Sequence, residues 1–333
     1  MTLREVPITR RRGQPSRRAR VTRSLLRAAI AAALAACTVS PLHAPSSGSP
    51  PAASEPPVAP VAVVPPAPAP ELPRGGRTIF PDYRLVGFCG TPGAPALGEL
   101  QGNLPAKAKE LEAKAAAYGE DRKTMPVFEL IAVVVQGWPG LDGKYRRRVD
   151  DSVVDAYLRA ARASKALLLL NIQPGQSDFL TETKTFEKYL REPDVGVALD
   201  PEWAMKPKQR PGQFFGQTTG AVISDVAAYL STIVKENNLP EKVLVFHQVN
   251  REVVKDETTV TAPPGVVVIK SIDGLGPVHA KIVTYDYLMK ILAQGVHPGF
   301  KLFFDEDTRN GGRLMAPSEV LALTPRPEYV MYE

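Results

Sequence analysis

Two acidic residues two positions apart offer the clearest chemistry in the chain. Asp200 and Glu202 follow the apolar run Val195–Leu199, in the order Asp200-Pro201-Glu202-Trp203. Residues two apart on an extended strand share a face, so both carboxyl groups would point the same way. Glycoside hydrolysis uses such groups, since one carboxyl protonates the leaving oxygen and another assists. The alternative is that these residues only form a turn and begin a helix.

Further polar residues follow other apolar runs along the chain. If those runs are strands of one barrel, their ends meet and the side chains form one site. We expect Glu202 to act as general acid and Asp200 to orient the substrate or assist it, while Asp305 or Asp307 supplies the second carboxylate of a two-carboxylate mechanism. A substrate-assisted mechanism does not need that second carboxylate. The residues expected to bind substrate are Gln173, Trp203, His247, Gln248, Asp273, Asp307 and Trp138.

These residues also have plainer interpretations. His247 is also typical of a buried core histidine, and Trp138 and Trp203 of packing residues. The run Asp305-Glu306-Asp307 fits a solvated loop or a cation site as well. We predict no zinc site, because the four His residues are scattered and no HExxH pattern or Cys pair is available, while calcium or magnesium at Asp305 and Asp307 stays an alternative to a site with no metal. No cofactor is predicted.

The elements that would position these residues alternate between strand and helix. The predicted strands are Tyr83–Cys89, Val127–Val135, Ala166–Ile172, Val195–Leu199, Val243–Val249, Val266–Ile272, Lys301–Phe304 and Tyr329–Met331. The predicted helices are Pro105–Tyr118, Asp150–Ala163, Phe179–Leu190, Ile223–Asn237 and Ile282–Leu292, with a short one starting at Pro317. Only the connection 251–264 lacks a helical pattern.

This alternation predicts an α/β fold, a (β/α)8 TIM-type barrel. Most runs are apolar throughout, as in Leu167–Leu170, which is typical of parallel strands buried on both faces. The alternative is an open doubly wound sheet, but Gly90-Thr91-Pro92-Gly93 after the first strand is not a phosphate-binding loop. The usual last helix is missing after the eighth strand, and residues 77–81 are expected to help cover that gap.

Several segments resemble, in the same order, an uncharacterised family of secreted bacterial lipoproteins. They are Asn171–Gly175, Asp178–Leu180, Gly196–Trp203, Phe246–Gln248, Asp273-Gly274 and Phe304–Asp307. The resemblance runs from about Phe80 to Glu333 and implies a glycosidase-like (β/α)8 barrel in an extracytoplasmic setting. It implies no particular reaction. Members of this family often carry Asp where Asn171 stands, so an amide replaces a carboxylate here.

The segment Gly196–Glu202 is also similar to the fourth-strand signature of the family-eighteen chitinases. That resemblance implies that Glu202 protonates the glycosidic oxygen and that Asp200 orients the acetamido group of the substrate. Two positions depart from the signature: Ala198 stands where the family has another Asp, and Pro201 differs too.

The first 36 residues resemble a lipoprotein signal peptide. They carry nine Arg and one Glu, then the apolar run Ala28–Ala36, which is too short to span a bilayer. Leu34-Ala35-Ala36-Cys37 resembles a lipobox, in which the cysteine is lipidated and becomes the new N-terminus. Alternatives are an ordinary secretory signal or an N-terminal helix. Arg17-Arg18 leaves twin-arginine export open beside the general secretory route.

Residues 37–76 have the composition of a disordered tether. Twelve of the 33 Pro residues lie between Pro41 and Pro73, mixed with Ala and Ser. The barrel domain is then residues 77–333. After residue 36 the chain carries 32 basic and 34 acidic residues, so its charge of −2 gives no footprint for nucleic acid. With Cys37 acylated, Cys89 has no partner and is expected to be a buried free thiol.

These patterns together predict a monomeric lipoprotein on the extracytoplasmic face of the cell membrane, anchored through lipid on Cys37. Its barrel is expected to bind a cell-envelope or environmental carbohydrate and, with Glu202 active, to hydrolyse it. The alternative is a non-catalytic lipoprotein that binds carbohydrate or cell wall on a degenerate barrel.

Overall fold

Eight parallel strands close into a barrel in the computed structural model, which describes residues 68–333. In ring order they are β1 (Tyr83–Gly90), β2 (Lys123–Val135), β4 (Leu167–Ile172), β5 (Val195–Leu199), β7 (Lys242–Gln248), β9 (Val266–Ile272), β10 (Val296–Leu302) and β11 (Tyr329–Tyr332). Pairing of β1 with both β2 and β11 closes the ring. The predicted (β/α)8 barrel is therefore confirmed, and the open sheet is excluded.

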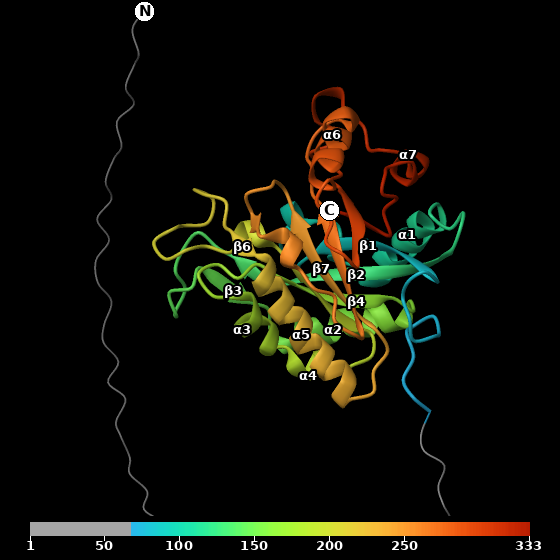
Figure 1. The fold of residues 1–333 in the computed structure, drawn as a ribbon, viewed down its shortest axis with the longest axis horizontal. Coiled ribbons are helices and arrows are strands. Elements are labelled where there is room, and N and C mark those ends of the chain that lie inside the picture. Colours follow the sequence, from blue (N-terminus) through green and yellow to red (C-terminus); the bar gives the residue numbers. More distant parts are fainter. Residues whose placement is uncertain (1–67) are drawn as a thin grey trace, which may run out of the picture. The chain divides into compact units, whose positions relative to one another are not determined.

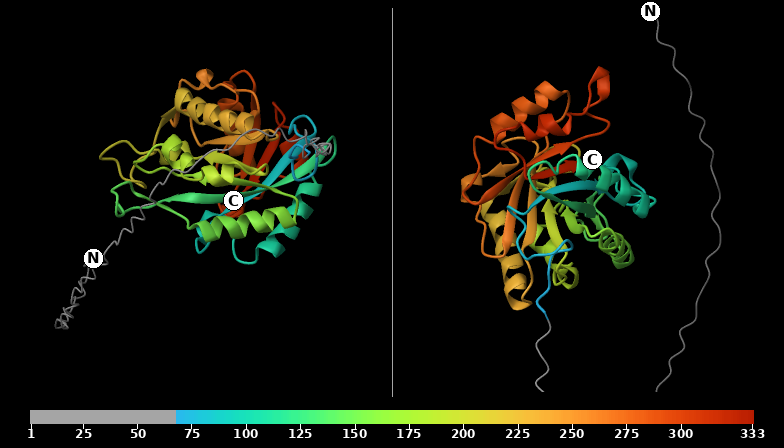
Figure 2. Two further views of the ribbon diagram at one scale, coloured as in Figure 1. Left: turned by 90° about the horizontal axis from the view of Figure 1, so that it is seen from below. Right: turned by 90° about the vertical axis from the view of Figure 1, so that its right-hand side faces the viewer.

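Helices lie outside the ring of strands (Figure 1; Figure 2). They are α1 (Leu104–Ala116), α2 (Asp151–Ala163), α3 (Phe179–Lys184), α4 (Glu187–Leu190), α5 (Gly220–Glu236), α6 (Val278–Leu288) and α7 (Pro317–Leu321). One apolar cluster fills the layer between strands and helices, and a second fills the barrel interior. Of the helices that the structure describes, none is both long and apolar enough to cross a bilayer.

The largest difference from the predicted elements is at β10. This strand begins at Val296 rather than at Lys301, because Pro298 and Gly299 have the composition of a turn but pair in register with β9. A Cβ on Gly299 would lie 3.0 Å from Ile269 Cγ2, so glycine permits close approach of the two strands. The predicted helix 179–190 divides into α3 and α4, and α6 begins four residues before its predicted start at Ile282.

Short strands and single helical turns lie at the C-terminal ends of the barrel strands. They are the strands β3 (Arg146–Arg148), β6 (Thr218–Thr219) and β8 (Val254–Lys255), and the single 3-10 turns η1 (Pro95–Leu97), η2 (Pro201–Trp203), η3 (Glu257–Thr259) and η4 (Arg309–Gly311). In the connection 251–264, where no helix was predicted, the only helical element is the single turn η3. These pieces shape the mouth of the barrel.

Residues 70–82 form a plug at the N-terminal end of the barrel. Leu72 and Ile79 are buried in the interior cluster. Arg77 donates hydrogen bonds to the carbonyls of Asn238 (3.0 Å) and Leu239 (2.9 Å). Residues 70–76, which their composition assigned to the tether, thus pack with the domain. Cys37 and the rest of the predicted tether lie outside the described residues.

Aromatic side chains cover the seam between β11 and β1, where no eighth helix follows among the described residues. Tyr332 lies 6.2 Å from Phe88 and 5.5 Å from Phe304 between ring centroids. Its hydroxyl lies 2.6 Å from that of Tyr118, and Lys114 sits 4.8 Å from the centre of its ring. This cluster, rather than residues 77–81, seals the outer face there.

Candidate functional site

A cavity of about 340 Å³ opens at the C-terminal ends of the barrel strands. Its polar wall comes from residues at the ends of β4, β5, β9, β10 and β11, and its apolar wall from the end of β2 and the loops above the strands. The polar residues are Gln173, Asp200, Glu202, Asp273, Lys301 and Glu333, and the apolar ones Leu97, Val135, Trp203, Phe215, Val249, Leu275 and Phe303. This is the end at which barrel enzymes place their sites.

Two larger grooves lie elsewhere on the domain. One, of about 510 Å³, runs between α1 and α2 and is lined largely by alanine and lysine side chains. The other, of about 610 Å³, lies beside the plug and exposes Asp121, Arg122 and Lys123. Neither is lined by a buried acid, so the chemistry of the domain centres on the mouth.

Glu202 is the exceptional acid of the cavity. It lies in η2, where its carbonyl accepts a hydrogen bond of 2.5 Å from the amide of Gly216. A Cβ on Gly216 would come within 2.5 Å of Ala204 N, so only glycine allows this close approach. The Glu202 side chain is 8% exposed, and its Oε2 has no partner among the described residues.

Burial and nearby negative charge favour the protonated form of Glu202. Loss of water contact, followed by the charges of Asp200 and Asp273, raises the pKa of Glu202 well above its usual value. The carboxyl group therefore keeps its proton to a higher pH than an exposed glutamic acid does, and it lines an open cavity. A neutral carboxylic acid in this position is a proton donor.

Asp200 is held by two amides on the neighbouring strand. Its Oδ1 accepts from Asn171 Nδ2 (3.0 Å) and its Oδ2 from Gln173 Nε2 (3.0 Å). Although it precedes η2, its side chain does not cap that turn. Burial raises the pKa of Asp200, while His247 and Lys301 oppose the rise. The side chain is a fixed acceptor at the cavity wall.

The contacts of Asn171 explain why an amide suits this position in β4, the third strand of the ring. Its Nδ2 donates both to Asp200 and to Glu129 Oε1 (2.8 Å). A carboxylate at this place would face two other carboxylates with no proton to share. The amide thus links the cavity wall to the barrel interior and positions its neighbours.

A charged network lies beneath the cavity. Glu129 accepts hydrogen bonds from His247 Nε2 (3.0 Å) and from the Tyr329 hydroxyl (2.7 Å), and His247 Nδ1 donates to Asp273 (3.0 Å). Burial opposes a charge on His247, but Asp273 and Glu129 raise its pKa well above the usual value. The His247 ring therefore lies between the carboxylates of Glu129 and Asp273, and both of them favour its protonated form.

Lys301 completes the network at the cavity wall. Its Nζ lies 2.6 Å from Glu333 Oε2 and 3.2 Å from Asp273 Oδ2. Although burial opposes ionisation of Asp273, the cations His247 and Lys301 lower its pKa to about 2. Asp273 is thus a permanent anion, and its charge helps to keep the proton on Glu202.

Several predicted site residues lie outside the cavity. Gln248 donates to Glu257 Oε2 (3.2 Å), and Trp138 is 64% exposed on the loop after β2. Asp305 is exposed, whereas Asp307 is buried in an ion pair with Lys281 (3.0 Å). The loop folds this way because Asp307 also accepts the amides of Gly276 and Phe303. Neither aspartate reaches the acid Glu202.

The other predicted site residues lie in the cavity wall or directly below it. Asp200, Glu202, Gln173, Trp203 and Asp273 all line the cavity, and His247 lies just below it. Cys89 is free and buried, as expected, and burial raises its thiol pKa well above the usual value. The described residues hold no group of three His, Cys, Asp or Glu side chains that could bind a metal ion.

Sequence reasoning missed four residues that the barrel brings to the site. They are Glu129, Lys301, Tyr329 and Glu333. A signal existed for one of them, because Glu129 is the single charged residue of the predicted strand Val127–Val135. A buried charge in such a strand must find a partner, and here the partners lie inside the barrel.

Comparisons with known proteins identify no family for this chain, so the class of the domain follows from its own strand order. No protein-family model and no curated protein matches the chain. One solved structure that resembles it is a hyperthermophilic endo-beta-1,4-glucanase in complex with substrate, at a TM-score of 0.33 and 7% identity, covering 68% of this chain and 80% of that chain. A likeness of this size says nothing about a reaction. The closed ring of strands defines a (β/α)8 barrel protein.

Proposed function

We propose that the barrel binds a polysaccharide in its mouth and hydrolyses a glycosidic bond there. The observation that carries this proposal is Glu202, a buried acid with a raised pKa and an unpartnered oxygen at the wall of an open cavity. Trp203 and Phe215 provide flat apolar surfaces beside it, of the kind that pack against sugar rings. Asp200 and Gln173 provide polar groups for sugar hydroxyls.

In this mechanism Glu202 gives its proton to the glycosidic oxygen as the bond to the anomeric carbon breaks. Asp200 holds the neighbouring acetamido group so that its carbonyl oxygen attacks that carbon. Water then opens the cyclic intermediate and returns a proton to Glu202. No step needs Asp305 or Asp307, which lie outside the cavity.

A polysaccharide screen tests this function. The protein is incubated with neutral, N-acetylated and anionic polysaccharides, and newly formed reducing ends are measured beside the variant Glu202→Gln. Release of reducing ends by the wild type alone supports hydrolysis. Binding of a polysaccharide with no release by either protein would instead assign the non-catalytic role.

The pH dependence of hydrolysis should reflect the raised pKa of Glu202. The acid works only while protonated, so kcat/KM is expected to fall as pH rises through that pKa, which lies well above 4.5. Removing the negative charge of Asp200 in Asp200→Asn should move this alkaline limb toward lower pH, because that charge helps to raise the pKa. A wild-type limb centred near pH 4.5 would contradict the assignment.

We further propose that Cys37 is lipidated and holds the domain at the extracytoplasmic face of the membrane. The support is the lipobox-like sequence Leu34-Ala35-Ala36-Cys37 after an Arg-rich region. Two or three acyl chains on one cysteine exceed what stable anchoring needs.

The anchor predicts a clear fractionation result. We expect the wild type in the membrane fraction, from which only detergent releases it. The Cys37→Ala variant should instead be absent from that fraction. Cys89→Ala serves as the matched control and should stay with the membrane, because Cys89 is buried in the barrel. Equal membrane retention of both variants, or an unmodified Cys37 by mass spectrometry, would rule the anchor out.

A further inference from the structure

Unpaired cations gather on one side of the barrel mouth. Residues 203–217 contain Lys206, Lys208 and Arg210 and no acidic residue. All three are exposed, and none makes an ion pair with a described residue. Lys144 and Arg147 in the neighbouring segment 136–148 are also exposed and free of such pairs. We call these five residues the basic rim.

Backbone contacts join the basic rim into one surface. The amide of Gln176 donates to the carbonyl of Lys144 (2.7 Å), and its side chain donates to the carbonyl of Gln209 (2.8 Å). Gly175 pairs with Ala204, which ties the loop after β4 to the loop after η2. The cations therefore sit on a connected ledge that leads to Trp203 and Phe215 in the cavity wall.

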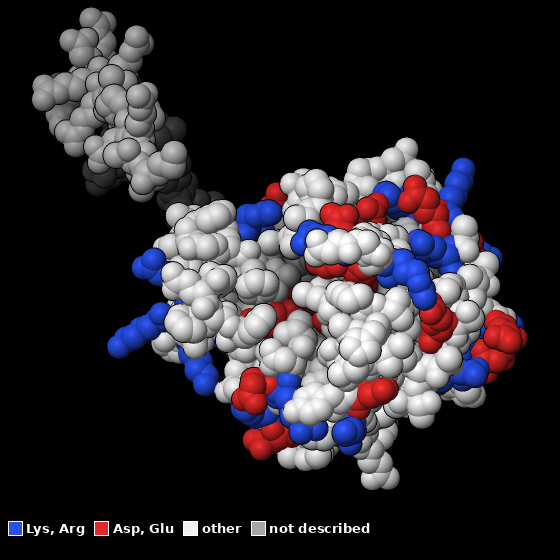
Figure 3. All heavy atoms as spheres, turned by 90° about the horizontal axis from the view of Figure 1, so that it is seen from above, with Lys and Arg blue, Asp and Glu red and all other residues white. Residues whose placement is uncertain are grey.

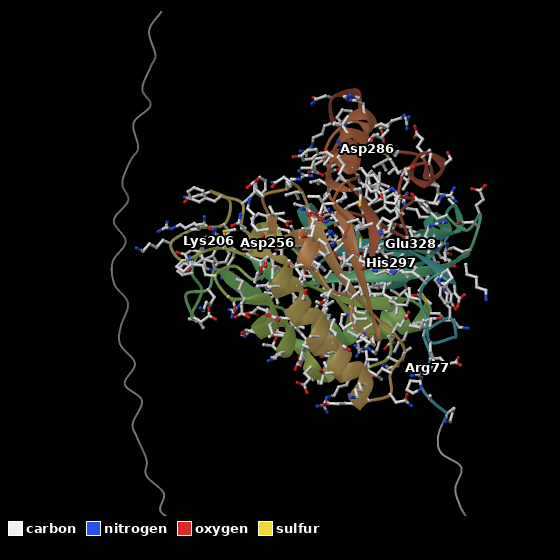
Figure 4. The ribbon with its side chains drawn as sticks, in the orientation of Figure 1. Arg77, Lys206, Asp256, Asp286, His297 and Glu328 are labelled. Atoms are coloured by element: carbon white, nitrogen blue, oxygen red, sulfur yellow. The ribbon has the colours of Figure 1, made fainter. Side chains whose placement is uncertain are left out.

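The rest of the domain does not share this charge. Residues 68–333 carry 32 basic and 33 acidic residues, a net charge of −1. Most basic side chains elsewhere pair with acids, as Arg146 and Arg148 do with Glu182 beside the rim. In Figure 3 blue side chains project from the left edge with few red neighbours, whereas both colours mix elsewhere. Figure 4 labels Lys206 at that edge, far from Arg77 of the plug.

We propose that the polysaccharide taken by this mouth is anionic, with carboxylate or phosphate groups on the units that flank the cavity. This inference rests on the proposed function and narrows its substrate. The basic rim would bind the charged units of the polymer, while the unit in the cavity meets the proton donor Glu202. A ledge of one sign beside a site also concentrates a polyanion and speeds its arrival.

The geometry favours a glycan over a nucleic acid. The rim ends at a cavity of about 340 Å³ whose own wall carries Asp200, Asp273 and Glu333. These acids would repel a phosphate placed on every unit, as in a nucleic acid. A polysaccharide can place neutral glycosidic bonds and hydroxyls in the cavity, while charged groups spaced along the polymer reach the basic rim.

Matched polymers test the proposal on the full chain solubilised in detergent. The probes are hyaluronan, in which carboxylate units alternate with N-acetylated units, its fully methyl-esterified form, and soluble chitin phosphorylated on a minority of its units, with affinity measured at low and high salt. The wild type should bind at least one charged polymer about tenfold more tightly than the neutral one, and high salt should remove the difference. The hyaluronan and phosphorylated-chitin arms distinguish the two sources of charge.

A triple variant tests the role of the basic rim itself. Lys206→Gln with Lys208→Gln and Arg210→Gln should weaken binding of the charged polymer by about tenfold. The control replaces Lys109, Lys235 and Lys290 by Gln, which removes the same charge from exposed positions on or next to α1, α5 and α6. It should bind as the wild type does.

Three results would overturn the inference: equal affinity for charged and neutral forms, no binding of either charged polymer, or equally tight binding of DNA. The proposed function fails separately. If Glu202→Gln abolishes hydrolysis of a neutral glycan that the rim variant still cleaves normally, the function stands and the anionic substrate falls.

Discussion

Replacing Glu202 by Gln is expected to reduce hydrolysis at least about 100-fold while leaving binding intact. General acid catalysis contributes roughly 10²- to 10⁴-fold, and Gln keeps the shape of the side chain but has no acidic proton. Because Glu202 Oε2 makes no hydrogen bond with a described residue, the substitution breaks none and should not disturb the fold. The measurements are initial rates of reducing-end release and the affinity for the same polysaccharide.

Asp305→Asn is the matched control for this experiment. Asp305 also lies at the mouth end of a strand but is exposed and outside the cavity, so its loss should change the rate by less than about twofold. A collapse of activity in Asp305→Asn, or near-normal activity in Glu202→Gln, would mean that the acid has been assigned to the wrong residue.

Replacing Glu129 by Gln is expected to lower the free energy of unfolding by about 3–5 kcal/mol. Removing one partner of a buried ion pair leaves the other charge uncompensated, which has costs of this size. Glu129 is fully buried and faces the His247 imidazolium, the Tyr329 hydroxyl and the Asn171 amide. A Gln amide oxygen could still accept from His247 and Asn171, but the amide NH2 group would then face the Tyr329 hydroxyl, which donates to the carboxylate of Glu129. Urea unfolding followed by fluorescence measures the change.

Two further variants calibrate the loss in Glu129→Gln. Tyr329→Phe removes a single hydrogen bond to the same carboxylate and should cost about 1.5–3 kcal/mol. Glu110→Gln changes an exposed acid and should cost less than about 0.5 kcal/mol. If Glu129→Gln proved no more harmful than Glu110→Gln, the charged network would not be holding the barrel interior together.

The fold was predictable because its signal is repeated. Most barrel strands are apolar runs that need cover on both faces, so composition and length reveal them, as for Leu167–Ile172. Where a strand carries turn-forming residues, as at Pro298 and Gly299, local composition misleads and only pairing with β9 reveals the strand. Tertiary contacts thus decide the elements whose local preference is weak.

The candidate site was predictable only in part, for a different reason. Residues such as Asp200 and Glu202 follow their strands directly, so their place at the mouth is a matter of topology. Whether Asp305 or Asp307 turns into the cavity depends on loop contacts, here the pairing of Asp307 with Lys281. Glu129 and Tyr329 meet across the barrel from positions 200 residues apart, and no local pattern encodes that distance.

The plug at the N-terminal end has a mechanical consequence. The plug lies at the end of the domain opposite the basic rim, as the positions of Arg77 and Lys206 show (Figure 4). A pull between the plug and a polymer bound at the mouth would run through the barrel from one end to the other. The force would act first on the hydrogen bonds that Arg77 donates to the carbonyls of Asn238 and Leu239. It would also act on the hydrogen bond from the amide of Ile79 to the carboxylate of Glu241. None of these residues lines the cavity, so the acid and its neighbours would keep their geometry under tension.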